Sequence, residues 1–247
     1  MTAISATPTG WNINENCGST HLDNLIKTVV ATNSDLGVAH DGDADRCLFV
    51  AANGDVIDGD FILNILANQW LAQGKLNKNT VVGTVMSNLG FVKSMESAGI
   101  AVEKTAVGDR YVLEKMLENN FNLGGEQSGH IIMRDFSNTG DGLLTALQVM
   151  QVIVNSQKSL SELASGMHKY PQILINVDGI KKDKLDSSIK LKDAIKASEV
   201  ELADKGRVLV RASGTESIVR VMVEANELQI AQQIADKLAS LVRSELN

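Results

Sequence analysis

The sequence predicts α/β domains followed by a small α+β domain, and three observations lead to this prediction. Short apolar runs alternate with segments of helical periodicity between residues 25 and 123, which is typical of βαβ units and a mostly parallel sheet. After Pro171 the order changes to strand, helix, two strands and a helix. Hydrophobic residues make up 44% of the 247 residues and charged residues 21%, which indicates an ordinary globular chain.

The first elements follow from apolar spacing. Asn53-Gly54 predicts a tight hairpin turn, Asp60 is a candidate helix cap, and Ser159 with Glu162 has capping-box spacing. In chain order we expect a helix at residues 25–31, strands at 36–40 and 47–51, a helix from Asp60, a strand at 81–86, a helix at 91–98, a strand at 101–105, a helix at 111–118, a strand at 121–123 and a long buried helix at 143–154.

The last third of the chain has the pattern of a small domain of strands and helices. The alternation of apolar and polar residues predicts three strands, and the final segment has helical periodicity. We expect a strand at 173–177, a polar loop at 181–186, a helix, strands at 208–211 and 219–224, and a helix at 228–243.

Composition excludes several classes of protein. The formal net charge of -7 argues against a nucleic-acid surface. Cys17 and Cys47 form no CxxC pair, so we expect neither a disulfide framework nor a zinc site. No signal peptide is visible, and the longest apolar stretch is too short and too polar to span a bilayer. We therefore expect a cytoplasmic protein with no membrane partner.

Asp41, Asp43 and Asp45 alternate on one short loop between two apolar runs, followed by Arg46. Carboxylates gathered in this way suit a hard cation, and Mg²⁺ leaves coordination positions open for a phosphate. An EF-hand is excluded because its sixth position needs Gly, where this loop has Arg46. The alternative is a solvated acidic turn.

Two further loops have the composition of binding sites. Residues 211–220 combine a Gly-bearing loop with hydroxyls and two guanidinium groups, which favours a phosphate clamp over an ordinary hairpin. Residues 124–130 place Glu126 and Ser128 at alternating positions, where both side chains can face one ligand such as a sugar. The alternative for this segment is a polar turn between strands. A charged turn at 107–111, before a helix, is a fourth candidate, and the alternative is that Asp109 only caps this helix.

Together these motifs resemble the α-D-phosphohexomutase superfamily over essentially the whole chain and in family order. Residues 41–46 are similar to its magnesium loop, 126–130 to its sugar-recognition loop, and 211–216 with Arg220 to its phosphate-binding loop. The strings at residues 12–14, 17–21, 86–90 and 107–112, together with Gln127, are similar to the branch that acts on hexosamine phosphates. A mutase of mannose or glucose phosphates is the nearest alternative, and Gln127 is the discriminating residue.

The resemblance implies an isomerase that moves a phosphoryl group on a hexosamine phosphate with Mg²⁺ as cofactor. It implies catalytic roles for Arg46 and His130, and it implies that Glu126 and Ser128 hold sugar hydroxyls. The implied magnesium ligands are Asp41, Asp43 and Asp45, and the implied phosphate ligands are Arg211, Ser213, Gly214, Thr215 and Arg220. It also implies three domains: residues 1–58 as the remnant of a second α/β domain, 59–171 as a third α/β domain, and 172–247 as the phosphate-binding domain.

The sequence departs from the superfamily in two respects. The phosphorylated serine of the family lies in an N-terminal domain without a counterpart in this sequence, so we expect part of a longer product with no turnover of its own. Ala212 and Ser217 replace two prolines of the phosphate loop, which removes a restriction on its backbone. Two alternatives are a fragment that binds sugar phosphate without chemistry and a phosphatase with an Asp nucleophile; for the latter, Asp45 stands where Thr or Val is required.

Overall fold

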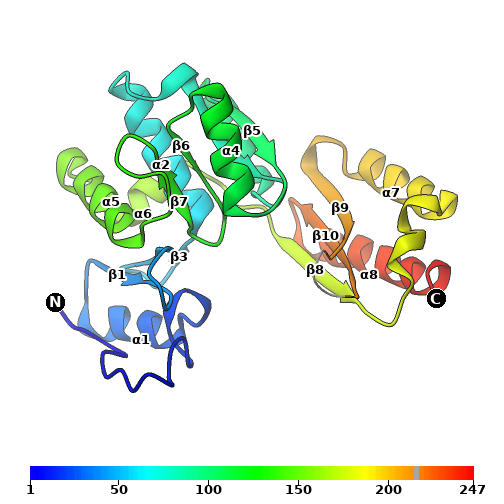
Figure 1. The fold of residues 1–247 in the computed structure, drawn as a ribbon, viewed down its shortest axis with the longest axis horizontal. Coiled ribbons are helices and arrows are strands. Elements are labelled where there is room, and N and C mark those ends of the chain that lie inside the picture. The colour runs from blue at the N-terminus through cyan, green and yellow to red at the C-terminus, as the bar shows by residue number, and fades with distance from the viewer. Residues whose placement is uncertain (214–216) are drawn as a thin grey trace. The chain divides into compact units, whose positions relative to one another are not determined.

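A computed structural model describes residues 1–213 and 217–247 of the chain (Figure 1). The chain divides into two compact units, Met1–His168 and Lys169–Asn247, and each unit has its own hydrophobic core. Both units combine helices with sheets, which confirms the predicted mixed α/β fold class. The expected division of the first unit at residue 58 stays a prediction.

A three-stranded antiparallel sheet carries the acidic loop. Its strands are hydrogen-bonded in the order β1-β2-β3, and helix α1 packs against β1 and β2. The turn between β2 and β3 contains Asn53 and Gly54, as predicted, and Gly54 has a φ of +90°. The elements are the short 3-10 helix η1 (Gly18–Thr20), α1 (Asp23–Thr32), β1 (Leu36–Ala39), β2 (Leu48–Ala51) and β3 (Val56–Ile57).

A four-stranded sheet in the order β5-β4-β6-β7 follows in the same unit. Strand β4 pairs in parallel with β5 and β6, whereas β6 and β7 are antiparallel. The strands are β4 (Thr80–Thr84), β5 (Ala101–Thr105), β6 (Leu123–Gly125) and β7 (Ile131–Met133). The helices around them are α2 (Gly59–Ala72), the 3-10 helix η2 (Asn77–Asn79), α3 (Leu89–Ser97), α4 (Asp109–Asn119), α5 (Gly142–Ser156) and α6 (Leu160–Ala164).

Both faces of this sheet are covered. Val81 belongs to the main core around α2, whereas its neighbour Val82 packs with Val112 and Met116 of α4. Successive residues of a strand point to opposite faces, so α2 and α4 lie on opposite sides of the sheet. Helix α2 also contacts α3, α5 and α6.

Four expectations for the first unit need correction. The sheets are not mostly parallel, because the first is antiparallel throughout and β7, which was not predicted, pairs antiparallel with β6. The cap of α2 is Asp58, whose side chain accepts bonds from the backbone N–H groups of Asp60 and Phe61, while Asp60 lies inside the first turn. The N-cap of α4 is Gly108, so Asp109 lies in the first turn of that helix and does not cap it.

The fourth correction concerns α5, which was expected to be a buried helix. Leu143, Leu147 and Val154 are 62%, 55% and 65% exposed, so one side of the helix is open to solvent. The predicted capping box of α6 is confirmed at Ser159 and Glu162. No helix among the described residues is both long enough and apolar enough to cross a bilayer.

The second unit is a three-stranded antiparallel sheet covered by two helices. Strand β10 lies between β8 and β9, and α7 and α8 pack against this sheet and against each other. Instead of the expected polar loop at 181–186 there is a 3-10 helix, η3 (Lys182–Ser187). The other elements are β8 (Gln172–Val177), α7 (Ile189–Leu202), the 3-10 helix η4 (Ala203–Lys205), β9 (Gly206–Ala212), β10 (Val219–Ala225) and α8 (Leu228–Glu245).

Candidate functional site

The acidic loop connects two paired strands of the first sheet. Ala39 at the end of β1 pairs with Leu48 at the start of β2, so residues 40–47 form the closed end of a hairpin. In this loop one ligand atom from each of Asp41, Asp43 and Asp45 lies within 4.8 Å of the others. The hairpin therefore gathers three carboxylates at one point, as a hard cation requires.

The electrostatics of the loop also favour a cation. The pKa of the Asp45 carboxyl is raised, first by burial and then by the negative charge of Asp41. Arg46 offsets part of this charge, because its Nε lies 3.5 Å from Asp41 Oδ2 and 3.9 Å from Asp45 Oδ1. The loop thus holds more negative charge than its own arginine neutralises.

Backbone contacts fix the shape of the acidic loop. The Asp41 carboxylate accepts a bond of 3.2 Å from the N–H of Arg46, and His40 Nδ1 lies 2.9 Å from the Arg46 carbonyl oxygen. The N–H of Gly142, at the start of α5, donates to the carbonyl of Ala44 at 2.8 Å. The loop is consequently held by its own hairpin and by a helix almost 100 residues later in the chain.

A second loop, residues 126–130 between β6 and β7, lies against the acidic loop. Cys47 N–H donates to the Gly129 carbonyl at 3.0 Å, and Arg46 and His130 form an isolated antiparallel bridge. His130 Nε2 lies 3.5 Å from Asp45 Oδ2 and 4.0 Å from Asp109 Oδ2. The buried imidazole of His130, which is 4% exposed, therefore lies between the acidic loop and the first turn of α4.

Glu126 connects the second loop to the turn before α4. Its Oε1 accepts a bond of 3.0 Å from the N–H of Gly108. Sequence reasoning named the turn at 107–111 as a separate candidate, and the structure places it beside both Glu126 and His130. Three segments distant in the sequence thus converge in the first unit.

Buried polar atoms gather at this convergence. Among the described residues, no hydrogen-bond partner is found for four of them: Asp45 Oδ1, Arg46 Nε, Ser128 Oγ and His130 Nδ1. Buried polar groups are nearly always hydrogen-bonded, and those that are not need an explanation such as a bound ion or ligand. All four belong to the two loops, which makes this part of the unit a candidate site for a polar ligand.

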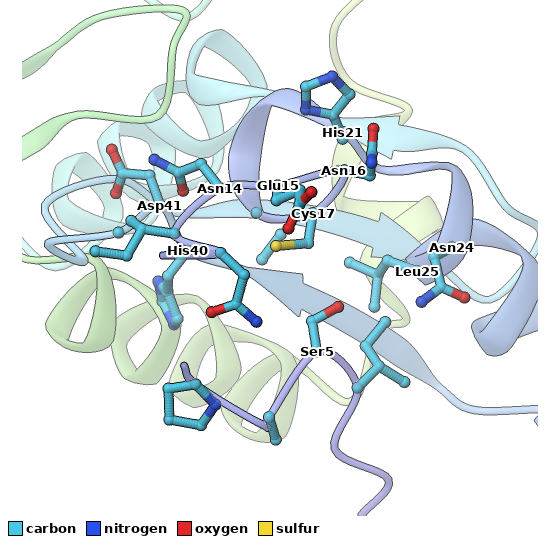
Figure 2. Close-up of a pocket in the computed structure, with 18 of the residues that line it drawn as sticks. Ser5, Asn14, Glu15, Asn16, Cys17, His21, Asn24, Leu25, His40 and Asp41 are labelled. Atoms are coloured by element: carbon cyan, nitrogen blue, oxygen red, sulfur yellow. The ribbon is translucent and has the colours of Figure 1, made fainter. Parts of the chain in front are cut away.

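A cavity of about 740 Å³ borders the acidic loop (Figure 2). It is lined by Asp41 and His40 and by the irregular segment that precedes α1, with Asn14, Cys17 and His21 among the side chains (Figure 2). This lining mixes polar and apolar side chains, and the sequence indicated no site residue in it apart from Asp41.

The phosphate-clamp candidates lie in the second unit. Arg211 on β9 and Arg220 on β10 are direct cross-strand neighbours. The pKa of the Arg211 guanidinium is lowered, first by burial and then by the charge of Arg220. Ser213, 4% exposed, donates its backbone N–H to the Ile218 carbonyl at 2.9 Å and so closes the loop between the strands. Gly214 and Thr215 lie outside the described residues.

Sequence reasoning missed the residues that position these loops. His40, Gly142 and Asp60 make the relevant contacts, and Asp60 accepts a bond of 3.2 Å from the Gln127 side chain. For Asp60 the signal in the sequence was a carboxylate in the apolar first turn of a helix, which was interpreted only as a cap.

Two parts of the chain match domains of one protein family. Residues 58–170 match the alpha/beta/alpha domain III of the phosphoglucomutase/phosphomannomutase family, and residues 174–241 match its C-terminal domain. Similar curated proteins include the phosphoglucosamine mutases of Brevibacillus brevis, 52% identical over 98% of this chain, and of Mycolicibacterium smegmatis, 53% identical over 97%. The chain spans about half the length of these relatives, 54% and 53% respectively.

Solved structures share the fold at lower identity. The N-acetylphosphoglucosamine mutase of Aspergillus fumigatus, in complex with GlcNAc-6P and magnesium, is 22% identical with a TM-score of 0.77 over 95% of this chain and 54% of that one. A phosphoglucomutase/phosphomannomutase family protein from Burkholderia thailandensis is 22% identical with a TM-score of 0.75 over 93% and 52%. These likenesses concern the arrangement of the backbone.

Proposed function

Because the chain belongs to the phosphoglucomutase/phosphomannomutase family, we propose that it supplies the metal, sugar and phosphate sites of a phosphoglucosamine mutase. Such an enzyme interconverts glucosamine 6-phosphate and glucosamine 1-phosphate. The choice of glucosamine as the sugar is supported by relatives named phosphoglucosamine mutase, which are 49% to 53% identical to this chain. The observation that carries the proposal is the convergence of the acidic loop and the 126–130 loop on four buried polar atoms without hydrogen-bond partners among the described residues.

The donor set of the acidic loop fits a magnesium ion. Asp41, Asp43 and Asp45 supply hard oxygen atoms that already lie close together, and one buried oxygen of Asp45 has no hydrogen-bond partner within the described part of the chain. When bound, the metal neutralises charge on the phosphoryl group that moves. The raised pKa of Asp45 is consistent with a carboxylate placed for such a charge.

The chain's own residues have separate tasks around this ion. Arg46, beside Asp41 and Asp45, is placed to contact the phosphoryl oxygens with its guanidinium fork. His130 Nε2 lies 3.5 Å from Asp45 Oδ2, and the family resemblance gives this imidazole the role of moving a proton to or from a sugar hydroxyl. Glu126 and Ser128 orient the sugar, Glu126 by accepting hydrogen bonds from its hydroxyl groups.

The second unit binds the phosphate that does not react. Arg211 and Arg220 form a pair of like charges on neighbouring strands, an arrangement that an oxyanion would stabilise. Ser213 adds a hydroxyl at the start of the same loop, and the roles proposed for Gly214 and Thr215 rest on the sequence. The reaction connects a sugar phosphorylated at position 6 with the same sugar phosphorylated at position 1. The enzyme therefore needs one site for the phosphate that reacts and a second site for the phosphate at the other position.

Calorimetric titration tests the proposal directly. Glucosamine 6-phosphate is titrated into the chain with Mg²⁺ present, in parallel with glucose 6-phosphate and mannose 6-phosphate. We expect glucosamine 6-phosphate to bind most tightly and Glu126→Gln to weaken it about tenfold, as expected for the loss of one charged hydrogen bond. Glu118→Gln, on the exposed end of α4, is the matched control. Equal affinity for the three sugars would refute the glucosamine assignment, and no binding at all would refute the proposed site.

A further inference from the structure

The side chain of Gln127 points into the protein at the start of α2. Its Nε2 donates a bond of 3.2 Å to Oδ2 of Asp60, a residue that is fully buried. The same oxygen accepts a bond of 2.7 Å from the N–H of Asn88, the N-cap of α3. One carboxylate oxygen thereby joins the 126–130 loop to the N-termini of two helices.

The backbone of Gln127 is held by the same helix. Its carbonyl accepts a bond of 3.0 Å from the N–H of Gly59, the residue before Asp60. A Cβ added at Gly59 would collide with the carbonyl oxygen of Glu126 and lie 2.8 Å from the N–H nitrogen of Gly129. The loop therefore rests directly on the backbone of the first turn of α2, at a point where only glycine leaves enough space.

We propose that Asp60 is a positioning residue for the sugar-binding side chains, and that it acts through Gln127. Gln127 lies between Glu126 and Ser128 in the sequence, so fixing both its amide and its carbonyl fixes the backbone from which those two side chains project. Gln127 then contributes to substrate binding through the protein and makes no contact with the sugar. This inference rests on the proposed function, because it assigns a support to the proposed sugar loop.

The chemistry of the contact suits this task. The Asp60 oxygen accepts bonds from both the Gln127 amide and the Asn88 N–H, so it holds the loop and the start of α3 at once. Burial keeps water from competing with Gln127 for the same oxygen, so the loop is held in one geometry. Binding groups need such support because displacement by about 1 Å can remove most of their effect.

Two variants test the inference: Gln127→Met, which keeps the length of the side chain but removes the amide, and Gln151→Met on the exposed side of α5, the matched control. We expect Gln127→Met to weaken glucosamine 6-phosphate binding about tenfold while Mg²⁺ affinity stays unchanged. The control is expected to have no effect on either affinity.

Hydrogen exchange of the peptide covering residues 124–131 provides a readout that needs no sugar. We expect faster exchange in Gln127→Met and no change in the control. Failure of the wild-type chain to bind glucosamine 6-phosphate would refute the proposed function alone, and the exchange rates would still test the contact. The inference is overturned if Gln127→Met binds the sugar phosphate as the wild type does, or if its loop exchanges at the wild-type rate.

Discussion

Arg211 and Arg220 face each other as a cross-strand pair between β9 and β10. Like charges at directly opposed positions destabilise an antiparallel pair. The pKa of Arg211 is lowered, first by its burial and then by Arg220, so the cost falls on a group that is already partly desolvated. The combined positive charge of the two arginines would attract an anion. In the proposed function this anion is the phosphate of the substrate.

The first prediction follows from this pair. In phosphate-free buffer, Arg211→Gln should leave the free energy of unfolding unchanged or raise it by about 0.5 kcal/mol, because a repulsion is removed. In the presence of inorganic phosphate, the wild type should gain stability and the variant should gain little. Thermal melts with and without phosphate measure both effects. Arg243→Gln, on the exposed side of α8, changes the same charge and serves as the control.

A phosphate-dependent gain in Arg211→Gln as large as that of the wild type would contradict the clamp. A strong destabilisation of this variant in phosphate-free buffer would contradict the repulsion between the two arginines. The two results are independent, because the first measures stabilisation by phosphate and the second measures the stability of the protein without phosphate.

The second prediction concerns magnesium. Mg²⁺ at about ten times its dissociation constant should raise the Tm of the first unit by about 3 °C. Asp43→Asn should remove most of this rise, because one of three carboxylate ligands is lost. Asp35→Asn, an exposed aspartate outside the acidic loop, should keep it. Scanning calorimetry with Mg²⁺ and with EDTA is the measurement, and an equal rise in the two variants would argue against a site in the loop.

The magnesium effect should also depend on pH in a stated direction. The pKa of Asp45 is raised above its ordinary value of 3.8, chiefly by burial, so ionised Asp45 destabilises the metal-free loop as the pH rises through 3.8 and beyond. Protonation competes with the metal for the same carboxylates. The Tm rise caused by Mg²⁺ should therefore be largest near pH 7 and disappear near pH 4, where a persistent rise would indicate binding elsewhere.

The sequence predicted the local features of this chain better than the distant ones. The convergence of Asp41, Asp43 and Asp45 depends on a loop of a few residues, so alternation along the chain was sufficient to expect it. The contact of His130 with Asp45 joins residues 85 positions apart, and it depends on the bridge between Arg46 and His130. The periodicity of apolar residues in a single sequence does not predict a contact between two loops so far apart.

Two errors have the same physical origin. Asp58 and Asp60 both precede an apolar helical pattern, and either side chain is able to cap a helix, so the sequence did not show that Asp60 bonds to Gln127 and Asn88 instead. The residues of α5 are rich in Leu and Val on more than one side, and this pattern does not tell which side the rest of the fold covers. Tertiary contacts decide both cases.

The third prediction concerns the two cysteines. Burial raises the pKa of the Cys47 thiol to about 12, and its side chain is fully buried, whereas Cys17 is only half-buried. At pH 8 about one Cys47 in ten thousand is a thiolate, so it should not react with a thiol reagent in the native chain. We expect one fast-reacting cysteine in the native protein and two in denaturant. Cys17→Ser should abolish the fast phase, and its persistence in that variant would show that Cys47 is accessible.

The last prediction concerns the buried ion pair of the second unit. Arg207 Nε donates to Glu224 Oε2 at 2.7 Å, and Arg207 Nη2 donates to Oε1 at 3.1 Å. The Glu224 side chain is fully buried, so Glu224→Ala removes two charge-assisted hydrogen bonds inside the unit and should cost about 3–5 kcal/mol in the free energy of unfolding. Glu245→Ala breaks an ion pair whose lysine, Lys190, is 76% exposed, and it should cost at most about 1 kcal/mol. Urea unfolding of the two variants measures this difference. Equal costs would mean that the two guanidinium hydrogen bonds to Glu224 contribute no more to the stability of the second unit than an ion pair at the surface.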